Sequence, residues 1–227
     1  MSLSADFSGA TEEVVVLLDL IDESSVSTLR QNAICRSATV LLVSHFESFV
    51  KSLAEQFIDD ISTGEIPAKA IPVGIRELHS RPRMEEIVSN PAQKQREALF
   101  RKYVAYNCLW VDDAKPPQGL LEPHKLRRTV TSAKSDVIDA LFELMGAKSP
   151  VCDGDIDIAY GNEDDPEPVS IRLMLRDVTK CRDDIAHGND GRIPTPQDVK
   201  RYRSQLLALA GRLEAKSAQL TKAITSA

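Results

Sequence analysis

The chain has 227 residues, of which 42% are hydrophobic and 27% charged, so it can bury one sizeable core and has an ordinary globular composition. Its formal net charge of −6 argues against a general nucleic-acid binder, and any contact with RNA must therefore come from a local basic patch. Only 5% of the residues are aromatic, which favours a helical bundle over a sandwich or barrel. We expect an all-α, up-and-down bundle with inserted loops and short helices, forming a single domain over residues 1–227.

Two helices are predicted in the first third of the chain. Residues 11–23 carry an apolar stripe, with Thr11 as the N-cap and two glutamates in the first turn. Residues 26–62 carry the strongest pattern, with apolar side chains at i, i+3 and i+4 over many turns. Gly64 and Pro67 are expected to end this second helix.

The middle of the chain alternates between helices and connections. Four prolines and two glycines between residues 63 and 92 predict a loop with short helical turns. Helices are predicted at residues 92–110 and, after a proline-rich connection, at residues 125–146, where Gly146 is the expected stop.

An acidic loop insertion over residues 147–169 follows, with a short strand predicted at residues 156–160. Asp153, Asp155 and Asp157 are similar to the start of a calcium loop, but Ile158 stands where that loop requires glycine. We therefore expect no metal there, and interpret the segment as a solvated loop or a docking surface for a basic partner.

Two helices complete the chain. One is predicted over residues 171–186, capped by Ser170. The other begins after Thr195 as N-cap, with Pro196 at the first helical position and Asp198 at the third, and runs to about residue 222.

The cysteines and the N-terminus indicate a cytoplasmic protein. Four cysteines are scattered without a CxxC pair, and Cys35 and Cys181 lie in apolar helical patterns that predict buried thiols. The polar N-terminal segment lacks the apolar core of a signal peptide, and no apolar run approaches the roughly 18 residues of a membrane span. A reduced compartment and no membrane contact are expected.

The segment RDDIAHG, residues 182–188, is the strongest candidate for a functional site. Arg182 carries a guanidinium that can bind phosphate, and His187 an imidazole that can move protons near neutral pH; a metal-free ribonuclease needs both groups. In a continued helix the two side chains would point about 140° apart and lie about 7.5 Å apart along the axis. They can converge only if the helix end unwinds, or if a second copy of the chain contributes.

Arg182 falls inside the apolar arc of its predicted helix, where an arginine must be paired or line a cleft. Glu47 is a candidate partner that would orient it. The competing interpretation pairs Glu47 with Lys51, one turn further along the same helix, as an ordinary surface ion pair. Arg176 and Lys180 lie with Arg172 on a separate basic stripe, which we interpret as a solvated face that can attract RNA phosphate.

These segments resemble the HEPN superfamily (higher eukaryotes and prokaryotes nucleotide-binding), whose mark is an R-x(4–6)-H motif on a late helix. RDDIAHG is similar in spacing and in its Ala-His-Gly ending, and SATVLLVSHFESFV at residues 37–50 resembles the early helix of bacterial HEPN proteins. The chain is most similar to the RiboL-PSP-HEPN group and to a second bacterial HEPN group. The resemblance covers most of the chain.

The resemblance implies a helical bundle that dimerises and, in many members, cleaves RNA without metal or other cofactor, with two such motifs facing across the dimer cleft. Carried over, His187 would transfer the proton of the RNA 2′-hydroxyl and Arg182 would stabilise the scissile phosphate, with Glu47, Lys51 and Asp183 in support. Active members often have asparagine directly after the arginine. Here Asp183 stands there, and its carboxylate would either repel phosphate or hold the histidine in position.

Several functions follow as alternatives. The first is an RNA-cleaving toxin or antiphage defence effector, with RNA, a second copy and an antitoxin or regulatory protein as partners. The second is a catalytically inactive HEPN module for protein interaction or nucleotide binding, and a third is an antitoxin-like regulatory protein. An accessible cleft lined by two copies of Arg182 and His187 favours the enzyme, whereas an Arg182 sealed in a salt bridge favours the module.

Overall fold

The computed structural model describes residues 2–22, 27–160, 165–189 and 191–226. The chain divides into two compact units that exchange segments along the sequence. Unit 1 comprises residues 1–50, 131–139 and 151–215, and unit 2 comprises residues 51–130, 140–150 and 216–227. That the whole chain forms one domain stays a prediction.

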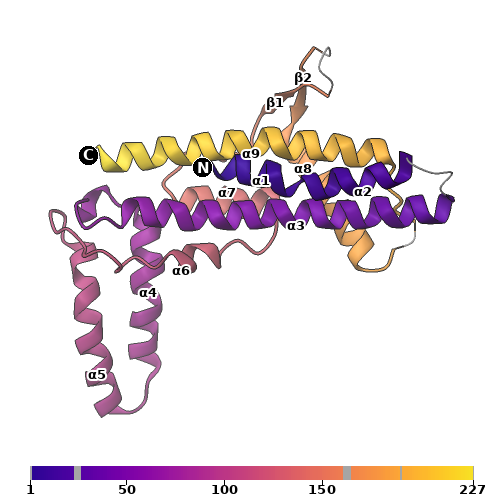
Figure 1. Cartoon of the computed structure of the whole chain (residues 1–227). Coiled ribbons are helices and arrows are strands. Elements are labelled where there is room, and N and C mark those ends of the chain that lie inside the picture. The colour runs from indigo at the N-terminus through magenta and orange to yellow at the C-terminus, as the bar shows by residue number, and fades with distance from the viewer. Residues whose placement is uncertain (1, 23–26, 161–164, 190, 227) are drawn as a thin grey trace. The chain divides into compact units, whose positions relative to one another are not determined.

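Helices make up nearly all of the regular structure in the described residues (Figure 1). The α-helices are α1 (Leu3–Ala10), α2 (Glu12–Asp22), α3 (Thr28–Ile61), α4 (Val73–Ser89), α5 (Gln93–Tyr103), α6 (Pro123–Arg127), α7 (Ser135–Leu144), α8 (Ile171–Ala186) and α9 (Pro196–Thr225). Two 3₁₀ helices, η1 (Ala68–Ala70) and η2 (Val104–Trp110), and a hairpin of β1 (Asp155–Ile158) and β2 (Glu167–Ser170) complete the list. The all-α prediction is confirmed.

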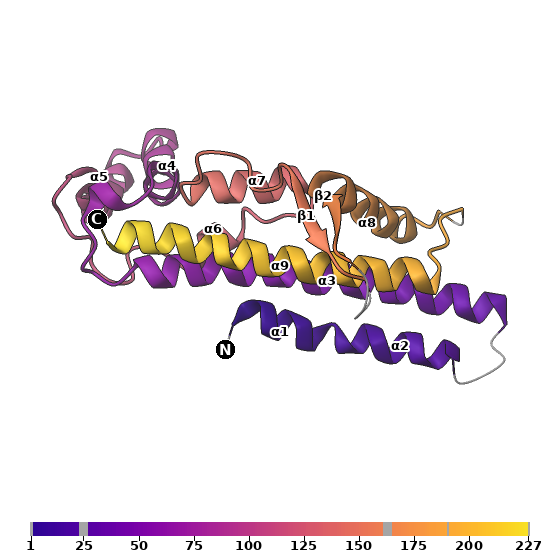
Figure 2. The same ribbon diagram turned by 90° about the horizontal axis from the view of Figure 1, so that it is seen from above.

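The core of unit 1 forms where its long helices meet. Figures 1 and 2 both show α1 and α2 following one another along α3, and α9 running beside α3. Phe7 of α1 packs against Phe46 and Phe49 of α3, with each of these ring centroid pairs 5.6 Å apart. Phe46 is fully buried, and such aromatic contacts add to the free energy gained by removing apolar area from water.

The acidic insertion forms the antiparallel hairpin of β1 and β2, which lies against α9 (Figure 2). Gln205 of α9 donates a hydrogen bond to the Tyr160 hydroxyl at 2.9 Å, and the Arg212 guanidinium donates to the Asp155 carbonyl at 2.8 Å. The first strand lies close to its predicted position, whereas the second was not predicted. Glu163 and Asp164 of the predicted acidic loop lie outside the described residues.

The start of α9 forms a capping box, as its sequence predicts. The Thr195 hydroxyl accepts a hydrogen bond from the Asp198 N–H at 3.1 Å, and the Asp198 carboxylate accepts one from the Thr195 N–H at 3.0 Å. Burial alone would raise the pKa of Asp198, but the hydrogen bonds from Thr195 and the charge of Arg201 outweigh it and lower this pKa below its ordinary value of 3.8.

Replacing Thr195 with alanine is expected to lower the free energy of unfolding by about 1 kcal/mol, because a helix N–H loses its acceptor. Since the folded state lowers the pKa of Asp198, its contribution is present above pH 3.8 and lost as the pH falls through the folded pKa. Urea denaturation near neutral pH and near pH 3 should therefore show a difference that shrinks in acid. The control is Gln197→Ala, an exposed residue in the same turn; an equal loss in both variants would contradict the capping role.

Several of the helix boundaries predicted from the sequence are wrong. A helix, α1, precedes the predicted first helix, and the Thr11 hydroxyl does not cap α2 but donates to the Ser8 carbonyl at 2.8 Å. Residues 63–92 were expected to form a loop but contain the 17-residue α4, with Pro82 inside it. The helix predicted at 125–146 is two helices, α6 and α7, and the latter closes at Gly146, whose φ is +97°.

In unit 2, the buried face of α4 explains why this helix forms despite its proline. Ile75, His79 and Ile87 are buried on one side of it. The His79 ring bonds the Ile75 carbonyl at 2.8 Å and accepts from the Glu122 N–H at 2.8 Å, so both ring nitrogens are satisfied. Burial lowers the pKa of His79 and keeps it neutral. Tertiary contacts thus outweigh the missing N–H of Pro82.

Helix α3 is long and apolar enough to cross a membrane by length and composition alone, although no span was predicted. Its most apolar 18-residue window has a mean hydropathy of 1.2, and 44% of that window is buried within the protein. Because the core helix of a globular protein meets the same two criteria, these properties are weak evidence for a membrane span.

Candidate functional site

Helix α8 remains regular through most of the RDDIAHG motif and ends sharply after Ala186. The N–H of Gly188 donates to the Ile185 carbonyl at 3.1 Å, and the N–H of Asn189 donates to the Asp184 carbonyl at 2.9 Å. With the positive φ of +76° at Gly188, this is a Schellman motif. The helix end does not unwind. The Arg182 and His187 side chains therefore stay about 140° apart around the helix and about 7.5 Å apart along its axis, as an α-helix requires.

Arg182 is held by two carboxylates. Its side chain is 24% exposed, and the guanidinium donates to Glu47 of α3 and forms an ion pair with Asp183 at 3.2 Å. Its Nε atom is buried and has no hydrogen-bond partner among the described residues. Arg182 thus lies within the apolar arc of α8, as predicted, and its charge is compensated there.

Glu47 and Lys51 do not form the ion pair on the surface of α3 that was one of the two interpretations. The Glu47 side chain is only 19% exposed and, besides Arg182, accepts a hydrogen bond from the Ala133 N–H at 3.3 Å. Within the described part of the chain, Lys51 forms no ion pair. The interpretation of Glu47 and Lys51 as a surface ion pair is therefore wrong, because Glu47 faces α8 and bonds Arg182.

Asp183 extends this arrangement into a chain of alternating charges. Its carboxylate lies 3.2 Å from Arg182 and 3.3 Å from the Lys134 amine, which precedes α7. We call Lys134, Asp183, Arg182 and Glu47 the Arg182 network. The two end residues come from segments far apart in sequence, so the network fixes Arg182 with respect to both α3 and the start of α7.

His187 lies at the exposed end of α8. It is the C-cap residue, and its side chain makes no hydrogen bond to any residue in the described segments. An exposed imidazole of this kind is available to exchange a proton with a substrate. Arg182 and His187 therefore differ in setting: the first is fixed and partly covered, and the second is open.

A groove of about 500 Å³ adjoins the Arg182 network. It lies between the start of α7 and one face of α8, and its lining residues are Lys134, Ser135, Asp136, Arg172, Leu173, Arg176, Thr179, Lys180 and Asp183. The predicted basic stripe of α8 forms one wall. Arg172 is tied at 2.6 Å to each of Asp139 and Asp153, whereas Arg176 and Lys180 are exposed and form no ion pair among the described residues.

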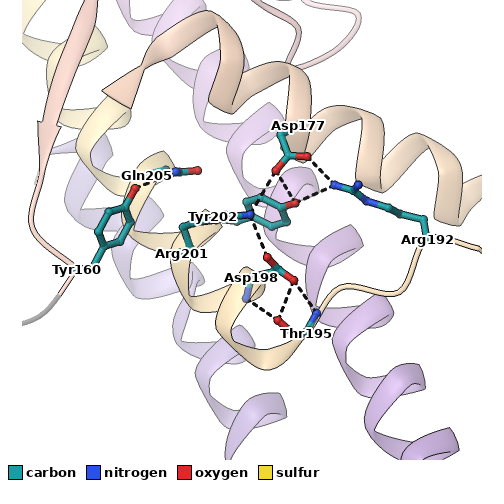
Figure 3. Close-up of polar contacts among 8 residues, drawn as sticks. All are labelled: Tyr160, Asp177, Arg192, Thr195, Asp198, Arg201, Tyr202 and Gln205. Carbon is teal, nitrogen blue, oxygen red and sulfur yellow. Dashed lines mark hydrogen bonds and ion pairs between the residues drawn. The ribbon is translucent and has the colours of Figure 1, made fainter. Parts of the chain in front are cut away.

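The segment after His187 is anchored by a second polar cluster, drawn in Figure 3. Asp177 of α8 accepts from Arg192 at 2.5 Å and from the buried Tyr202 hydroxyl at 2.8 Å. Burial and the nearby Asp177 carboxylate raise the pKa of Tyr202 to about 12, so it remains a neutral donor. Arg36 of α3 donates to the Asn189 and Arg192 carbonyls at 3.1 and 3.3 Å.

Sequence reasoning missed this anchor. The only signal was an arginine in the short connection between Gly188 and Thr195. Helical periodicity predicts no role for a residue outside the helices. The two predicted buried thiols, Cys35 and Cys181, are confirmed. Within the residues that the structure describes, no group of three or more His, Cys, Asp or Glu side chains is arranged to hold a metal ion.

Comparison with known families decides the relationship. The family model RiboL-PSP-HEPN matches residues 5–216, which include most of α1, most of α9 and the whole RDDIAHG segment. The chain belongs to the RiboL-PSP-HEPN family. No curated protein and no solved structure gives a significant match. The HEPN resemblance of the sequence and the all-α fold expected for a HEPN protein are both confirmed.

Proposed function

We propose that this RiboL-PSP-HEPN protein is a metal-independent endoribonuclease whose catalytic residues are Arg182 and His187. The observation that supports it most is the contrast between these two residues on one helix of a HEPN domain. Arg182 is a fixed cation beside a basic groove, and His187 is an exposed imidazole with no other bond in the described structure.

The chemistry follows from what the two groups can do. His187 takes the proton of an RNA 2′-hydroxyl, whose oxygen attacks the adjacent phosphorus while the bond from phosphorus to the 5′-oxygen breaks. The leaving 5′-oxygen takes a proton from a water molecule, and the hydroxide so formed is neutralised by the proton that His187 gave up to solvent. Arg182 stabilises the negative charge that builds on the phosphoryl oxygens. The products are a 2′,3′-cyclic phosphate and a 5′-hydroxyl. DNA lacks the nucleophile and is not cleaved.

A homodimer is part of the proposal because one copy of α8 separates the two side chains. The helix stays regular to Ala186, so one copy cannot bring both groups to one phosphate. Two copies related by a twofold axis can place Arg182 of one chain opposite His187 of the other, giving two equivalent sites.

Mixing two inactive variants tests this arrangement. Arg182→Gln and His187→Ala proteins are each expected to be inactive, but after subunit exchange half of the dimers contain one intact site. The mixture should recover about a quarter of the wild-type cleavage rate, as a statistical twofold assembly requires. The cleavage rate of a fluorescently labelled RNA is measured for the mixture and, as controls, for each variant alone. No recovery despite exchange, detected by tag capture, contradicts a shared site.

In the cell we propose that this activity serves as a toxin or antiphage defence effector in the cytoplasm, restrained by an antitoxin or regulatory protein. Induced expression of wild type is expected to arrest growth and degrade RNA, whereas His187→Ala should do neither. Equal growth and equal RNA integrity for the two proteins would remove the nuclease from consideration.

One observation favours a second candidate, an inactive HEPN module that binds a partner protein or a nucleotide. Arg182 already has two carboxylate partners, Glu47 and Asp183, which compete with phosphate for its guanidinium. The module predicts that Arg182→Gln and His187→Ala leave the cellular phenotype unchanged, so the same growth measurement separates the two functions.

A further inference from the structure

The groove beside α8 concentrates positive charge on an otherwise acidic chain. Its lining holds the cations Lys134, Arg172, Arg176 and Lys180 against the two acids Asp136 and Asp183, whereas the whole chain has a net charge of −6. Arg172, Arg176 and Lys180 follow one another at intervals of four residues, so they form a row along one face of the helix. A row of cations spaced by about 6 Å suits a polyanionic strand better than a single small anion.

Arg176 and Lys180 are the cations of this row that are free for a ligand. Arg172 is engaged by Asp139 and Asp153, whereas neither Arg176 nor Lys180 pairs with an acid in the described segments. Leu173, on the same wall, is an exposed apolar side chain. The wall thus offers unpaired positive charge for a phosphodiester backbone, beside an apolar surface for the bases of a nucleic-acid strand.

Asp183 lines the groove and forms an ion pair with Arg182, which is not itself a lining residue. Its carboxylate lies between two cations, 3.3 Å from Lys134 and 3.2 Å from Arg182, and belongs both to the groove lining and to the Arg182 network. A phosphate oxygen on its way to Arg182 would need the same contacts. The Asp183 carboxylate therefore occupies the place between Lys134 and Arg182 that a phosphate oxygen would take.

We propose that this groove binds the phosphodiester backbone of an RNA strand through Arg176 and Lys180, and that Asp183 is a built-in competitor for the phosphate position next to Arg182. The proposal rests on the proposed function, since it takes RNA as the substrate. It assigns binding to residues distinct from His187, which performs the proton transfer.

The test measures binding of a fluorescent 2′-O-methyl RNA oligonucleotide, which has no free 2′-hydroxyl and cannot be cleaved. Arg176→Gln with Lys180→Gln is expected to weaken binding at least tenfold at about 0.1 M salt and to reduce the slope of log K against log salt by about 1.4, or about 0.7 for each lost phosphate contact. The matched control is Arg101→Gln with Lys102→Gln, which removes the same two charges from exposed positions on α5.

Asp183→Asn is expected to strengthen binding at least about fivefold, because it removes a negative charge close to the bound phosphate. Asp136→Asn removes another acid of the groove that has no cation partner in the described structure, and should give a smaller gain. Equal affinity of the groove variant and the α5 control would overturn the groove. Unchanged or weaker binding by Asp183→Asn would overturn its role as a competitor.

Binding and cleavage fail separately in this design. If the groove variant loses binding, and His187→Ala binds the oligonucleotide like wild type but cleaves nothing, the groove and the nuclease both hold. If the wild type binds the oligonucleotide but cleaves no RNA, and the groove variant binds more weakly, the groove stands and the nuclease falls. If cleavage is normal in the groove variant and its binding is unchanged, the nuclease stands and the groove falls.

Discussion

Replacing His187 with alanine is expected to lower the rate of RNA cleavage by about 10²- to 10⁴-fold, the usual contribution of a general base or acid. The free energy of unfolding should stay within about 0.5 kcal/mol of wild type, because an exposed side chain without bonds in the described structure contributes little to stability. Single-turnover cleavage of a labelled RNA and urea denaturation measure the two quantities.

The matched control for His187→Ala is His124→Ala, since the His124 side chain is 49% exposed but lies in unit 2. It should cleave at the wild-type rate. Comparable losses in both histidine variants, or a wild-type rate in His187→Ala, would show that the imidazole of His187 is not the proton-transfer group.

Replacing Glu47 with alanine is expected to lower the free energy of unfolding by about 2–3 kcal/mol, less than the roughly 3–5 kcal/mol of a fully buried broken ion pair, because both side chains keep some exposure. The variant leaves Arg182 with Asp183 alone and leaves the Ala133 N–H without its acceptor. RNA cleavage should also fall, because the guanidinium is no longer held toward α3.

A double variant separates the structural from the catalytic effect of Glu47. Glu47→Ala with Arg182→Met removes the uncompensated charge and should regain most of the lost stability, since well-packed apolar side chains often replace a buried pair without cost. It should remain inactive, because no guanidinium is present. Stability no better than that of Glu47→Ala, or recovered cleavage, would contradict the assigned pairing.

The long helices were predictable because their periodicity is strong and local. The pattern of α3, α8 and α9 fixes which face is apolar, and their ends carry turn and cap residues such as Gly188 and Thr195. Helix α4 was not predictable from proline content, since its formation depends on burial of Ile75 and His79 against residues distant in sequence. The break at residues 128–134 was missed for a different reason, because the apolar spacing continues through it.

The candidate site was predictable only as far as one helix determines it. Helical geometry shows that Arg182 lies on the apolar face and that His187 points elsewhere, and the structure agrees. The partners were not predictable in this way, because Glu47 is 135 residues from Arg182 in sequence and the sequence favoured its pairing with Lys51. Likewise the groove needs Lys134, which no periodicity links to Arg176 and Lys180.

The closed end of α8 has a consequence for how the activity would be controlled. If the proposed shared site holds, a single chain would carry only half of each site and would be inactive by itself, so cleavage would depend on how often two chains meet. Where most chains are unpaired, the population of dimers rises with the square of the total concentration. A cell with few copies would therefore keep most of its RNA intact, and a twofold rise in synthesis would raise the population of dimers about fourfold. By keeping Arg182 and His187 apart within one chain, the helix cap at Gly188 would thus make cleavage depend on the concentration of the protein.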